Sequence, residues 1–560
     1  MDILPLWDGM CYYEHQVQGV HWMLLKEMTG TEVAPATIRG GLQCDDMGLG
    51  KTIQILGTMR NNPQPKTLLL CPLAMVSTWV ETARRSGFPT YTVSGGGKTK
   101  HWALVKGGKG NKGNKGNKGK SSKGEGSKMA TEPSLYVTNY DQLVHNPRIV
   151  MGSGESTDRD WMEGAEGDEG AEAVDGWDRV VCDEAHRLRN PNTVIYNRAR
   201  KIQARLRWAV TGTPIVNNFK DAAALFHFIG VPGSISTGSS LFYELIGGLV
   251  IRRSMEEIRG VVEGVPPAAK FECKTLDFAS EEEEELYRAC QGLVDKLKYH
   301  RDSLGRNEKL VLLLRLRQLS VSPQVYTEAM RLKDKHYDLS FTAPSTKMLA
   351  LADLIEETPT GKFLVFCSFI REMEILQAFL QETFELEGGI ELYHGGLTGA
   401  ERTATLARVK KPECRVMLVQ LQSGGVGLNL QEFDQIAFMS PWWTAALMDQ
   451  AVARAVRIGQ TKAVTVTHLR LAEEEAMNID QIMMDSADRK RGFLELFFRY
   501  TTPPEVALAD AAETVAEAEE ADAEAVEAIA KMLEAADAEA AAAAVAEDAE
   551  DAEDAEEDPQ

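Results

Sequence analysis

Paired cysteines are missing from this 560-residue sequence. Its eight cysteines lie at positions 11, 44, 71, 182, 273, 290, 367 and 414, and no two of them form a CxxC pair. Neither a zinc finger nor a disulfide framework is supported by this spacing. We therefore expect reduced thiols and no structural zinc.

Long apolar runs are missing as well. No stretch approaches the roughly 18 apolar residues of a membrane span, and the opening MDILPLWDGM does not show a basic segment followed by an apolar one. A secretory signal would need both features. We expect a soluble, intracellular protein with no membrane partner.

An excess of basic charge is also absent. The net charge of −22, however, does not describe the whole chain evenly. From 504 to 560 the chain has 21 acidic residues and one lysine, which leaves the first 503 residues at a net charge of −2. We expect 503–560 to be an acidic Ala/Glu/Asp-rich tail that is largely disordered or helical. Histone binding, competition with DNA and simple solubilisation remain alternatives for this tail. The nearly neutral body must bind any polyanion through local basic patches.

Apolar strands alternate with helical segments in two regions of the chain. The first region contains KTLLLCPL, SLYVTNYDQL, WDRVVCDEAH and RLRWAVTGTP, and the second contains GKFLVFCSF, CRVMLVQL, QIAFMSP and AVTVTHLRL. This alternation predicts an α/β fold with two doubly wound parallel-sheet lobes, at 1–250 and 346–502. The charge-rich segments between them predict a helical linker or protrusion at 251–345.

Two insertions interrupt the first lobe. Residues 95–128 hold ten lysines and one glutamate among many glycines, and residues 152–176 are rich in glycine and acidic residues. Such compositions predict disordered surface loops. The lysines would add nonspecific contacts to DNA phosphates, or the insertion is simply tolerated because long loops cost little entropy.

A phosphate-binding loop is indicated by LQCDDMGLGKTIQIL, which runs from Leu42 to Leu56. Gly48 and Gly50 allow backbone N–H groups to approach phosphate oxygens, Lys51 can reach the β- and γ-phosphates, and Thr52 can ligate Mg²⁺. The full pattern asks for a glycine where this chain has Asp45. Taken alone, the stretch also fits an ordinary helix start.

A second motif, RVVCDEAH, places two acids at the end of an apolar strand. Asp183 can hold Mg²⁺, and Glu184 can orient or deprotonate the attacking water. By itself this pattern is also typical of a surface turn. Both motifs in this order make a nucleotide site the better interpretation.

Together, DDMGLGKTIQ, CDEAHRLRN and TGTPIVNN resemble the Swi/Snf-type ATPases, the DNA-translocating branch of helicase superfamily two, over about residues 11–500. That family begins its phosphate loop with an acidic pair, so Asp45 and Asp46 fit. The resemblance implies two RecA-like lobes, ATP and Mg²⁺ between them, and double-stranded DNA as partner. LLLRLRQLS is similar to the repair-linked branch, but without a CxxC pair there is no RING finger.

The resemblance also implies roles for individual residues. The catalytic residues would be Lys51, Glu184, Arg454 and Arg457. The ATP-binding residues would be Gln16, Asp46, Met47, Gly48, Leu49, Gly50, Lys51 and Thr52, with Thr52 and Asp183 as metal ligands. Among them, Gln16 would read the adenine base. The residues that couple hydrolysis to lobe movement would be Thr211, Gly212, Thr213 and Gln450. The DNA-binding residues would be Pro72, Ser77, Trp79, Thr138, Tyr140, Ser368, Gly424, Gly425, Asn429 and Trp442.

Three positions depart from the family's usual pattern. Ala453 and Val456 stand where an acid and a histidine are common beside the two arginines, and Ser440 stands where an aspartate is common. None of these changes removes an ATP ligand, but the contacts that position the arginines are altered.

The sequence predicts a DNA-dependent ATPase that translocates along double-stranded DNA and remodels or displaces bound proteins, with histones or nucleosomes among the candidates. The family resemblance alone implies a nuclear location. A strand-separating DNA or RNA helicase and a non-hydrolysing DNA- or chromatin-binding scaffold remain the alternatives.

Overall fold

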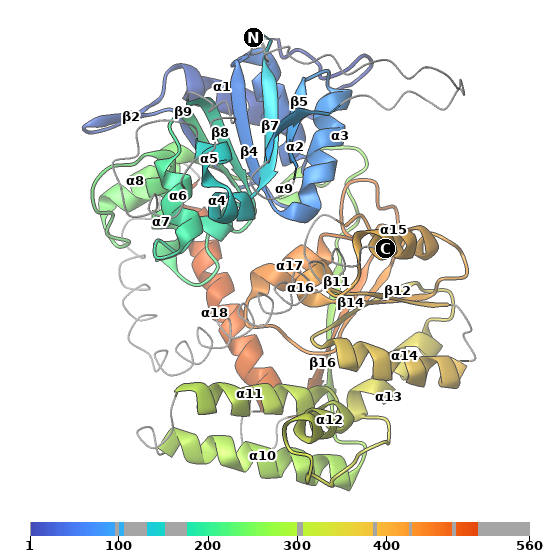
Figure 1. Cartoon of the computed structure of the whole chain (residues 1–560). Coiled ribbons are helices and arrows are strands. Elements are labelled where there is room, and N and C mark those ends of the chain that lie inside the picture. Colours follow the sequence, from blue (N-terminus) through green and yellow to red (C-terminus); the bar gives the residue numbers. More distant parts are fainter. Residues whose placement is uncertain are drawn as a thin grey trace, which may run out of the picture. The chain divides into compact units, whose positions relative to one another are not determined.

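The structure is a computed structural model that describes residues 2–95, 100–105, 132–151, 176–299, 306–384, 389–424, 428–472 and 478–501. The chain divides into two compact units (Figure 1). Among the described residues, unit 1 comprises those up to Ile258 together with 496–501, and unit 2 comprises those within Arg259–Glu495. The predicted tail and most of the two predicted loops lie outside the described residues.

Unit 1 is built on an eight-stranded sheet in the order β10-β3-β9-β8-β4-β7-β5-β6. All neighbouring strands run parallel except β6, which is antiparallel to β5. The strands are β3 (Gly40–Gln43), β4 (Lys66–Cys71), β5 (Thr90–Ser94), β6 (His101–Leu104), β7 (Ser134–Asn139), β8 (Trp177–Asp183), β9 (Ala204–Val210) and β10 (Val250–Ile251). Because the central strands are buried on both faces, they read as continuous apolar runs such as KTLLLC.

Helices and a short hairpin complete unit 1. They are α1 (Glu14–Met28), α2 (Lys51–Asn61), α3 (Val76–Arg85), α4 (Asp141–His145), α5 (Pro147–Met151), α6 (Val194–Lys201), α7 (Phe219–Ile229), α8 (Ser240–Leu249) and α9 (Met255–Ile258), the 3₁₀ turns η1 (Leu73–Met75) and η4 (Ala185–Leu188), and the hairpin strands β1 (Thr31–Val33) and β2 (Ala36–Ile38). Local signals set several helix starts. Helix α7, for example, begins with a reciprocal capping box between Asn218 and Asp221.

A fully buried ion pair lies in the core of unit 1. Arg179 on β8 donates from Nε and Nη2 to the two carboxylate oxygens of Glu27 on α1, at 2.6 Å each. The indole N–H of Trp208 donates to the same carboxylate at 2.9 Å, and Asn62 donates at 2.7 Å. Glu27 therefore fixes α1 against the sheet through donors from several separate elements.

Unit 2 is built on a six-stranded, all-parallel sheet in the order β11-β16-β15-β12-β14-β13. The strands are β11 (Lys270–Leu276), β12 (Phe363–Cys367), β13 (Ile390–Tyr393), β14 (Val416–Gln420), β15 (Gln435–Phe438) and β16 (Thr465–Leu471). The helices are α10 (Glu281–Tyr299), α11 (Arg306–Val321), α12 (Pro323–Lys333), α13 (Thr346–Glu357), α14 (Ile370–Phe384), α15 (Gly399–Val409), α16 (Leu421–Gly424), α17 (Ala445–Val452) and α18 (Ile479–Arg499).

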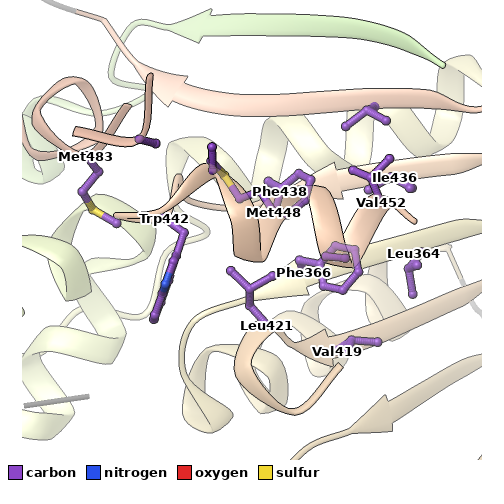
Figure 2. Packing of buried hydrophobic residues seen from close by; sticks show 14 of the residues in the cluster. Leu364, Phe366, Val419, Leu421, Ile436, Phe438, Trp442, Met448, Val452 and Met483 are labelled. Atoms are coloured by element: carbon purple, nitrogen blue, oxygen red, sulfur yellow. The ribbon is translucent and has the colours of Figure 1, made fainter. Parts of the chain in front are cut away.

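Side chains from the centre of this sheet form one of the two hydrophobic clusters described in unit 2 (Figure 2). Phe366 and Phe438 stack with ring centroids 5.0 Å apart, and the imidazole of His468 stacks on the same Phe438 at 4.7 Å. Met448 and Val452 of α17 belong to this cluster, as does Met483 of α18. The segment that carries the predicted arginine pair therefore follows a helix that is anchored in the core.

Two sequence expectations about loops and linkers are wrong in part. Residues 95–128 were expected to be one loop, but His101–Leu104 form β6, because Trp102 packs edge-on against Tyr136 and Trp177. The segment 251–345 was expected to be helical, but Lys270–Leu276 form β11 at one edge of the second sheet. Four of the seven β11 side chains are exposed, which hides the strand from a reading based on hydrophobicity.

Where the chain is described, no helix combines the length and hydrophobicity needed to cross a bilayer. The eight cysteines are all free thiols, and six of them are buried. Within the same described ranges, no three His, Cys, Asp or Glu side chains converge in a way that could hold a metal ion.

Candidate functional site

The predicted phosphate loop connects β3 to α2 and has the backbone that its glycines allow. Gly48 and Gly50 adopt positive φ angles of 85° and 79°. A Cβ on Gly50 would lie 2.5 Å from Nε2 of Gln16, and the positive φ would strain any other residue there. No side chain caps the N-terminus of α2, which leaves its first N–H groups available to an anion.

Lys51 is held by the loop that precedes it. Its Nζ donates to the backbone carbonyl of Asp45 at 2.8 Å and to that of Asp46 at 3.2 Å. Lys51 and Thr52 are partly exposed at the start of α2. The ammonium group therefore already lies over the loop in which the phosphates are expected to bind.

Asp45, which replaces the first glycine of the usual pattern, anchors the loop from inside. Its buried carboxylate accepts hydrogen bonds from Nε2 of Gln43 and of Gln54, at 2.8 Å each. Arg253 adds its backbone N–H at 3.0 Å and its Nε at 2.9 Å. Sequence reasoning missed Arg253, since no local pattern indicates which of many arginines will meet a buried acid.

Asp46 ties the same loop to the segment after β10. Its Oδ2 accepts the backbone N–H of Met255 at 2.9 Å, and its Oδ1 lies 3.1 Å from Nη2 of Arg252. The acidic pair is thus structural as well as part of the nucleotide loop, because each acid binds the 252–255 segment.

Helix α1 lies directly against the loop. Gln16, the predicted adenine-reading residue, donates from Nε2 to the carbonyl of Leu49 at 3.3 Å and accepts from the N–H of Tyr13 at 3.2 Å. Nε2 of His15 lies 3.0 Å from the same carbonyl, and burial lowers the pKa of His15. Since both ends of the Gln16 amide already bind the protein, the predicted contact with adenine requires that one of these bonds be exchanged.

Asp183 ends β8 as a buried carboxylate. Its Oδ2 accepts the indole N–H of Trp79 at 2.7 Å, and its Oδ1 accepts the backbone N–H of Glu184 at 3.0 Å. Burial raises the pKa of Asp183 to about 6, and the charge of Glu184 adds to this effect, while Lys51 opposes it. A buried carboxylate short of positive charge, together with the hydroxyl of Thr52, is an oxygen donor set that suits Mg²⁺.

Glu184 has a strained backbone. Its φ of 51° makes it the one residue other than glycine with a positive φ among those described. Such strain costs on the order of 1–3 kcal/mol and is concentrated at functional sites. The carboxylate lies 3.3 Å from Nδ1 of His186, and the same nitrogen lies 3.2 Å from Oγ1 of Thr211.

The predicted coupling residues continue this network. The N–H of Thr213 donates to Oγ1 of Thr211 at 3.1 Å, and the N–H of Thr211 donates to the carbonyl of Gln43 at 3.1 Å. A Cβ on Gly212 would lie 3.4 Å from the Asp45 carbonyl and 3.6 Å from Nζ of Lys51. The structure therefore brings Thr211–Thr213 against the phosphate loop. No role was predicted for His186 from the sequence, although its position two residues after Glu184 could have indicated one.

Several predicted DNA contacts in unit 1 fall on buried residues. Trp79 and Tyr140 are fully buried, and both bind Asp183, since the Tyr140 hydroxyl donates to the Asp183 carbonyl at 2.7 Å. The Thr138 side chain and Pro72 are buried too, and a DNA-binding role for these four residues stays a prediction. Ser77 is exposed and stays a predicted contact.

The two predicted arginines of unit 2 lie in a turn just after α17. The carbonyl of Arg454 accepts the N–H of Leu430 at 3.0 Å. The amide of Gln431 donates to the carbonyls of Arg457 and Ile458, at 3.4 and 2.7 Å. Burial lowers the pKa of Arg457. Backbone contacts thus position the turn, and its two unusual residues, Ala453 and Val456, are partly buried in it.

A second glutamine amide fixes the other side of this turn. Nε2 of Gln460 donates to the carbonyls of Gln431 and Phe433, at 2.9 and 3.2 Å. Gln450, predicted to take part in coupling, is buried on α17. Its functional role stays a prediction.

Of the predicted DNA contacts in unit 2, Trp442 is buried, and its role stays a prediction. Its ring is 5% exposed and lies 4.6 Å from the guanidinium carbon of the buried Arg317. Ser368 is partly buried at the end of β12, Gly424 ends α16, and Asn429 is exposed. Gly425 lies outside the described residues.

Sequence reasoning also missed Glu372, a buried acid beside Ser368. Its Oε2 accepts the backbone N–H groups of Ser368 and Phe369, at 2.8 and 3.0 Å. Burial raises the pKa of Glu372 to about 7 despite these donors. The acid is the third residue of α14 and organises the turn that presents Ser368.

Comparison with known proteins follows the same two units. Residues 15–323 match the SNF2-related domain family, and residues 346–459 match the helicase conserved C-terminal domain family. The chain is 25% identical over 523 residues to the "Probable global transactivator" of Orgyia pseudotsugata multicapsid polyhedrosis virus, covering 89% of this chain and 94% of that protein.

Longer relatives match over a part of their length. "Zorya protein ZorD" of Escherichia coli is 25% identical over 87% of this chain and 45% of its own. The mouse "DNA excision repair protein ERCC-6-like" is 26% identical over 88% of this chain and 43% of its own. The chain therefore spans less than half of the length of these two relatives.

Among solved structures, the "Sulfolobus solfataricus SWI2/SNF2 ATPase core in complex with dsDNA" is similar, with 20% identity, 90% of this chain covered and a TM-score of 0.36. The family match itself covers more than half of the chain and contains the phosphate loop, the acidic strand end and the coupling segment. This protein therefore belongs to the SNF2-related family of Swi/Snf-type superfamily-two ATPases and is a DNA-dependent ATPase.

Proposed function

We propose that this protein uses ATP hydrolysis to translocate along double-stranded DNA and thereby remodels or displaces proteins bound to it. One observation carries the proposal. Glu184, His186 and Thr211 form a continuous chain of polar contacts that leads to Thr213 and adjoins the phosphate loop. Residues assigned to hydrolysis and residues assigned to coupling thus belong to one network of contacts.

The proposed chemistry assigns one task to each group. The N-terminus of α2 and Lys51 bind the β- and γ-phosphates. Thr52 and Asp183 would hold Mg²⁺, which would supply positive charge to offset that of the phosphates. Glu184 orients the attacking water and accepts its proton.

The arginine turn of unit 2 supplies the last element of this proposal. Arg454 and Arg457 would stabilise charge on the transferring phosphoryl group, so hydrolysis would require lobe closure. The amides of Gln431 and Gln460 hold the turn by its backbone. They support a functional role for the arginines despite the unusual neighbouring residue Ala453.

The names of several relatives favour DNA as the track. They include "DNA excision repair protein ERCC-6-like" of Mus musculus and "Chromodomain-helicase-DNA-binding protein 1-like" of Danio rerio. We propose a chromatin-remodelling or DNA-repair role, with nucleosomes or other DNA-bound proteins as substrates and the nucleus as the location. Fluorescence microscopy of the tagged full chain tests the location, and a purely cytoplasmic signal would contradict it.

The test measures ATPase rate with no nucleic acid, with single-stranded DNA, with duplex DNA and with RNA. The control variants are Glu184→Gln and Arg457→Ala. We expect duplex DNA to stimulate wild-type hydrolysis most strongly and both variants to lose this stimulation.

Translocation and strand separation are then distinguished directly. Displacement of a third strand from a DNA triplex reports translocation along a duplex, whereas release of one strand from a duplex reports helicase activity. Strand release would favour the helicase alternative. DNA binding without hydrolysis above the Glu184→Gln background would overturn the motor and leave the scaffold.

A further inference from the structure

The last turn of α18 packs into unit 1, although its sequence lies about 450 residues after the phosphate loop (Figure 1). Phe497 is fully buried against Phe242, with ring centroids 6.4 Å apart. Tyr500 is 7% exposed and lies on Tyr243 at 4.2 Å. The segment Leu496–Tyr500, called here the C-terminal latch, is therefore a fixed part of unit 1.

Phe498 connects this latch to a charged group. Its ring centroid lies 4.1 Å from the guanidinium carbon of Arg252, and the ring is 8% exposed. Arginine stacks well on aromatic faces because its planar cation is weakly hydrated. The ring therefore restricts a side chain that would otherwise sample many rotamers.

Arg252 also contacts the phosphate loop. Its Nη2 lies 3.1 Å from Oδ1 of Asp46. The backbone carbonyl of Asp46 accepts a hydrogen bond from the ammonium group of Lys51 at 3.2 Å. The three contacts form a relay from Phe498 through Arg252 and Asp46 to Lys51. Each member lies within unit 1.

We propose that Phe498 and Arg252 are positioning residues that set the affinity of the phosphate loop for ATP. The proposal rests on the assignment of this loop as the nucleotide site. The ring holds the Arg252 guanidinium beside Asp46. The positive charge of Arg252 then compensates the negative charge of the Asp46 carboxylate and keeps this carboxylate in place. Without the ring, Arg252 moves away from Asp46, and an uncompensated negative charge next to the loop disfavours the polyphosphate of ATP.

The experiment compares full-length Phe498→Leu and Phe498→Tyr. Leucine keeps an apolar side chain but has no aromatic face, while tyrosine keeps that face. We expect Phe498→Leu to raise the Kd for a fluorescent ATP analogue and the KM for ATP by roughly three- to tenfold, as a lost cation–π contact implies. The kcat at saturating ATP should change little, and Phe498→Tyr should behave like wild type.

Phe497→Leu is the matched control in the same latch. It also removes a buried ring, which packs on Phe242 at 6.4 Å and edge-on to Phe498 at 5.5 Å instead of on Arg252. We expect it to lower the unfolding temperature without weakening ATP binding. An equal loss of ATP affinity in Phe497→Leu and Phe498→Leu would overturn the proposal, because it would show that the latch acts only through stability.

Arg252→Ala provides a second route that does not depend on the latch folding normally. If Phe498 acts through Arg252, the double variant Arg252→Ala/Phe498→Leu should bind ATP no more weakly than Arg252→Ala alone. Additive losses would refute the relay. This test does not depend on the outcome for the proposed function, because the Kd for ATP is measured without DNA. A lack of stimulation by duplex DNA would contradict translocation, but the ATP affinities of these variants could still be interpreted.

Discussion

Replacement of Trp79 by phenylalanine tests whether this tryptophan serves the metal site or DNA. The change removes the indole N–H that donates to the buried Asp183 carboxylate at 2.7 Å. A hydrogen bond to a charged group contributes about 1.5–3 kcal/mol, so the concentration of Mg²⁺ needed for half-maximal ATPase activity should rise about 10- to 100-fold.

The pH dependence of the same variant gives a second readout. The deprotonated carboxylate is the form that binds metal, and the Trp79 hydrogen bond lowers the pKa of Asp183 from the value that burial would otherwise produce. Without this bond the pKa rises further above about 6. The acidic limb of the rate profile should therefore move to higher pH in Trp79→Phe.

Trp208→Phe is the matched control for this experiment. Trp208 is also fully buried and donates its indole N–H to a buried carboxylate, that of Glu27, at 2.9 Å. Both variants should lose comparable stability to urea, while only Trp79→Phe should change the Mg²⁺ requirement. An unchanged Mg²⁺ requirement with weakened DNA binding in Trp79→Phe would refute the reasoning and restore Trp79 as a DNA contact.

Three further predictions concern other buried polar groups. Glu372→Gln should remove a pH dependence of the free energy of unfolding. The folded-state pKa of Glu372 is raised from 4.5 to about 7, so protonation of this carboxylate favours the fold. As pH rises from 4.5 to 7, the stability of the wild type to urea should therefore fall by up to about 3 kcal/mol relative to the variant. Arg253→Met should lower the free energy of unfolding by about 3–5 kcal/mol, because it leaves the Asp45 carboxylate buried without its cation; a midpoint in urea equal to that of wild type would contradict this. His186→Ala should retain ATP binding but lose triplex displacement per ATP hydrolysed, since it breaks the contact to Thr211. Unchanged coupling would show that the contacts of His186 with Glu184 and Thr211 are not needed for coupling.

Much of the fold could be predicted because buried parallel strands are recorded locally as apolar runs. The strand KTLLLC, for example, is almost fully buried and was visible in the sequence. The strands β6 and β11 were missed because few of their side chains are buried. Both lie at sheet edges, where tertiary pairing holds a strand that its own composition does not indicate.

The candidate site, too, could be predicted from the sequence only in part. The sequence indicated Lys51, Asp183 and Glu184 because phosphate and metal chemistry requires these residue types at fixed short spacings. It gave no means to separate Trp79 from a surface aromatic, since burial depends on which elements cover a side chain. Its indole reaches Asp183, which is 104 residues away in the chain.

By itself the sequence determined the two-lobed α/β architecture and the family, and it predicted the nucleotide chemistry, because each depends on local patterns of hydrophobicity, glycine and acid. Tertiary structure alone decided which groups surround the residues predicted to carry that chemistry. Arg252 and Arg253 meet the acidic pair from more than 200 residues away, and Phe498 reaches Arg252 from the last turn of α18. Such contacts depend on the packing of distant elements, which leaves no fixed spacing in the sequence.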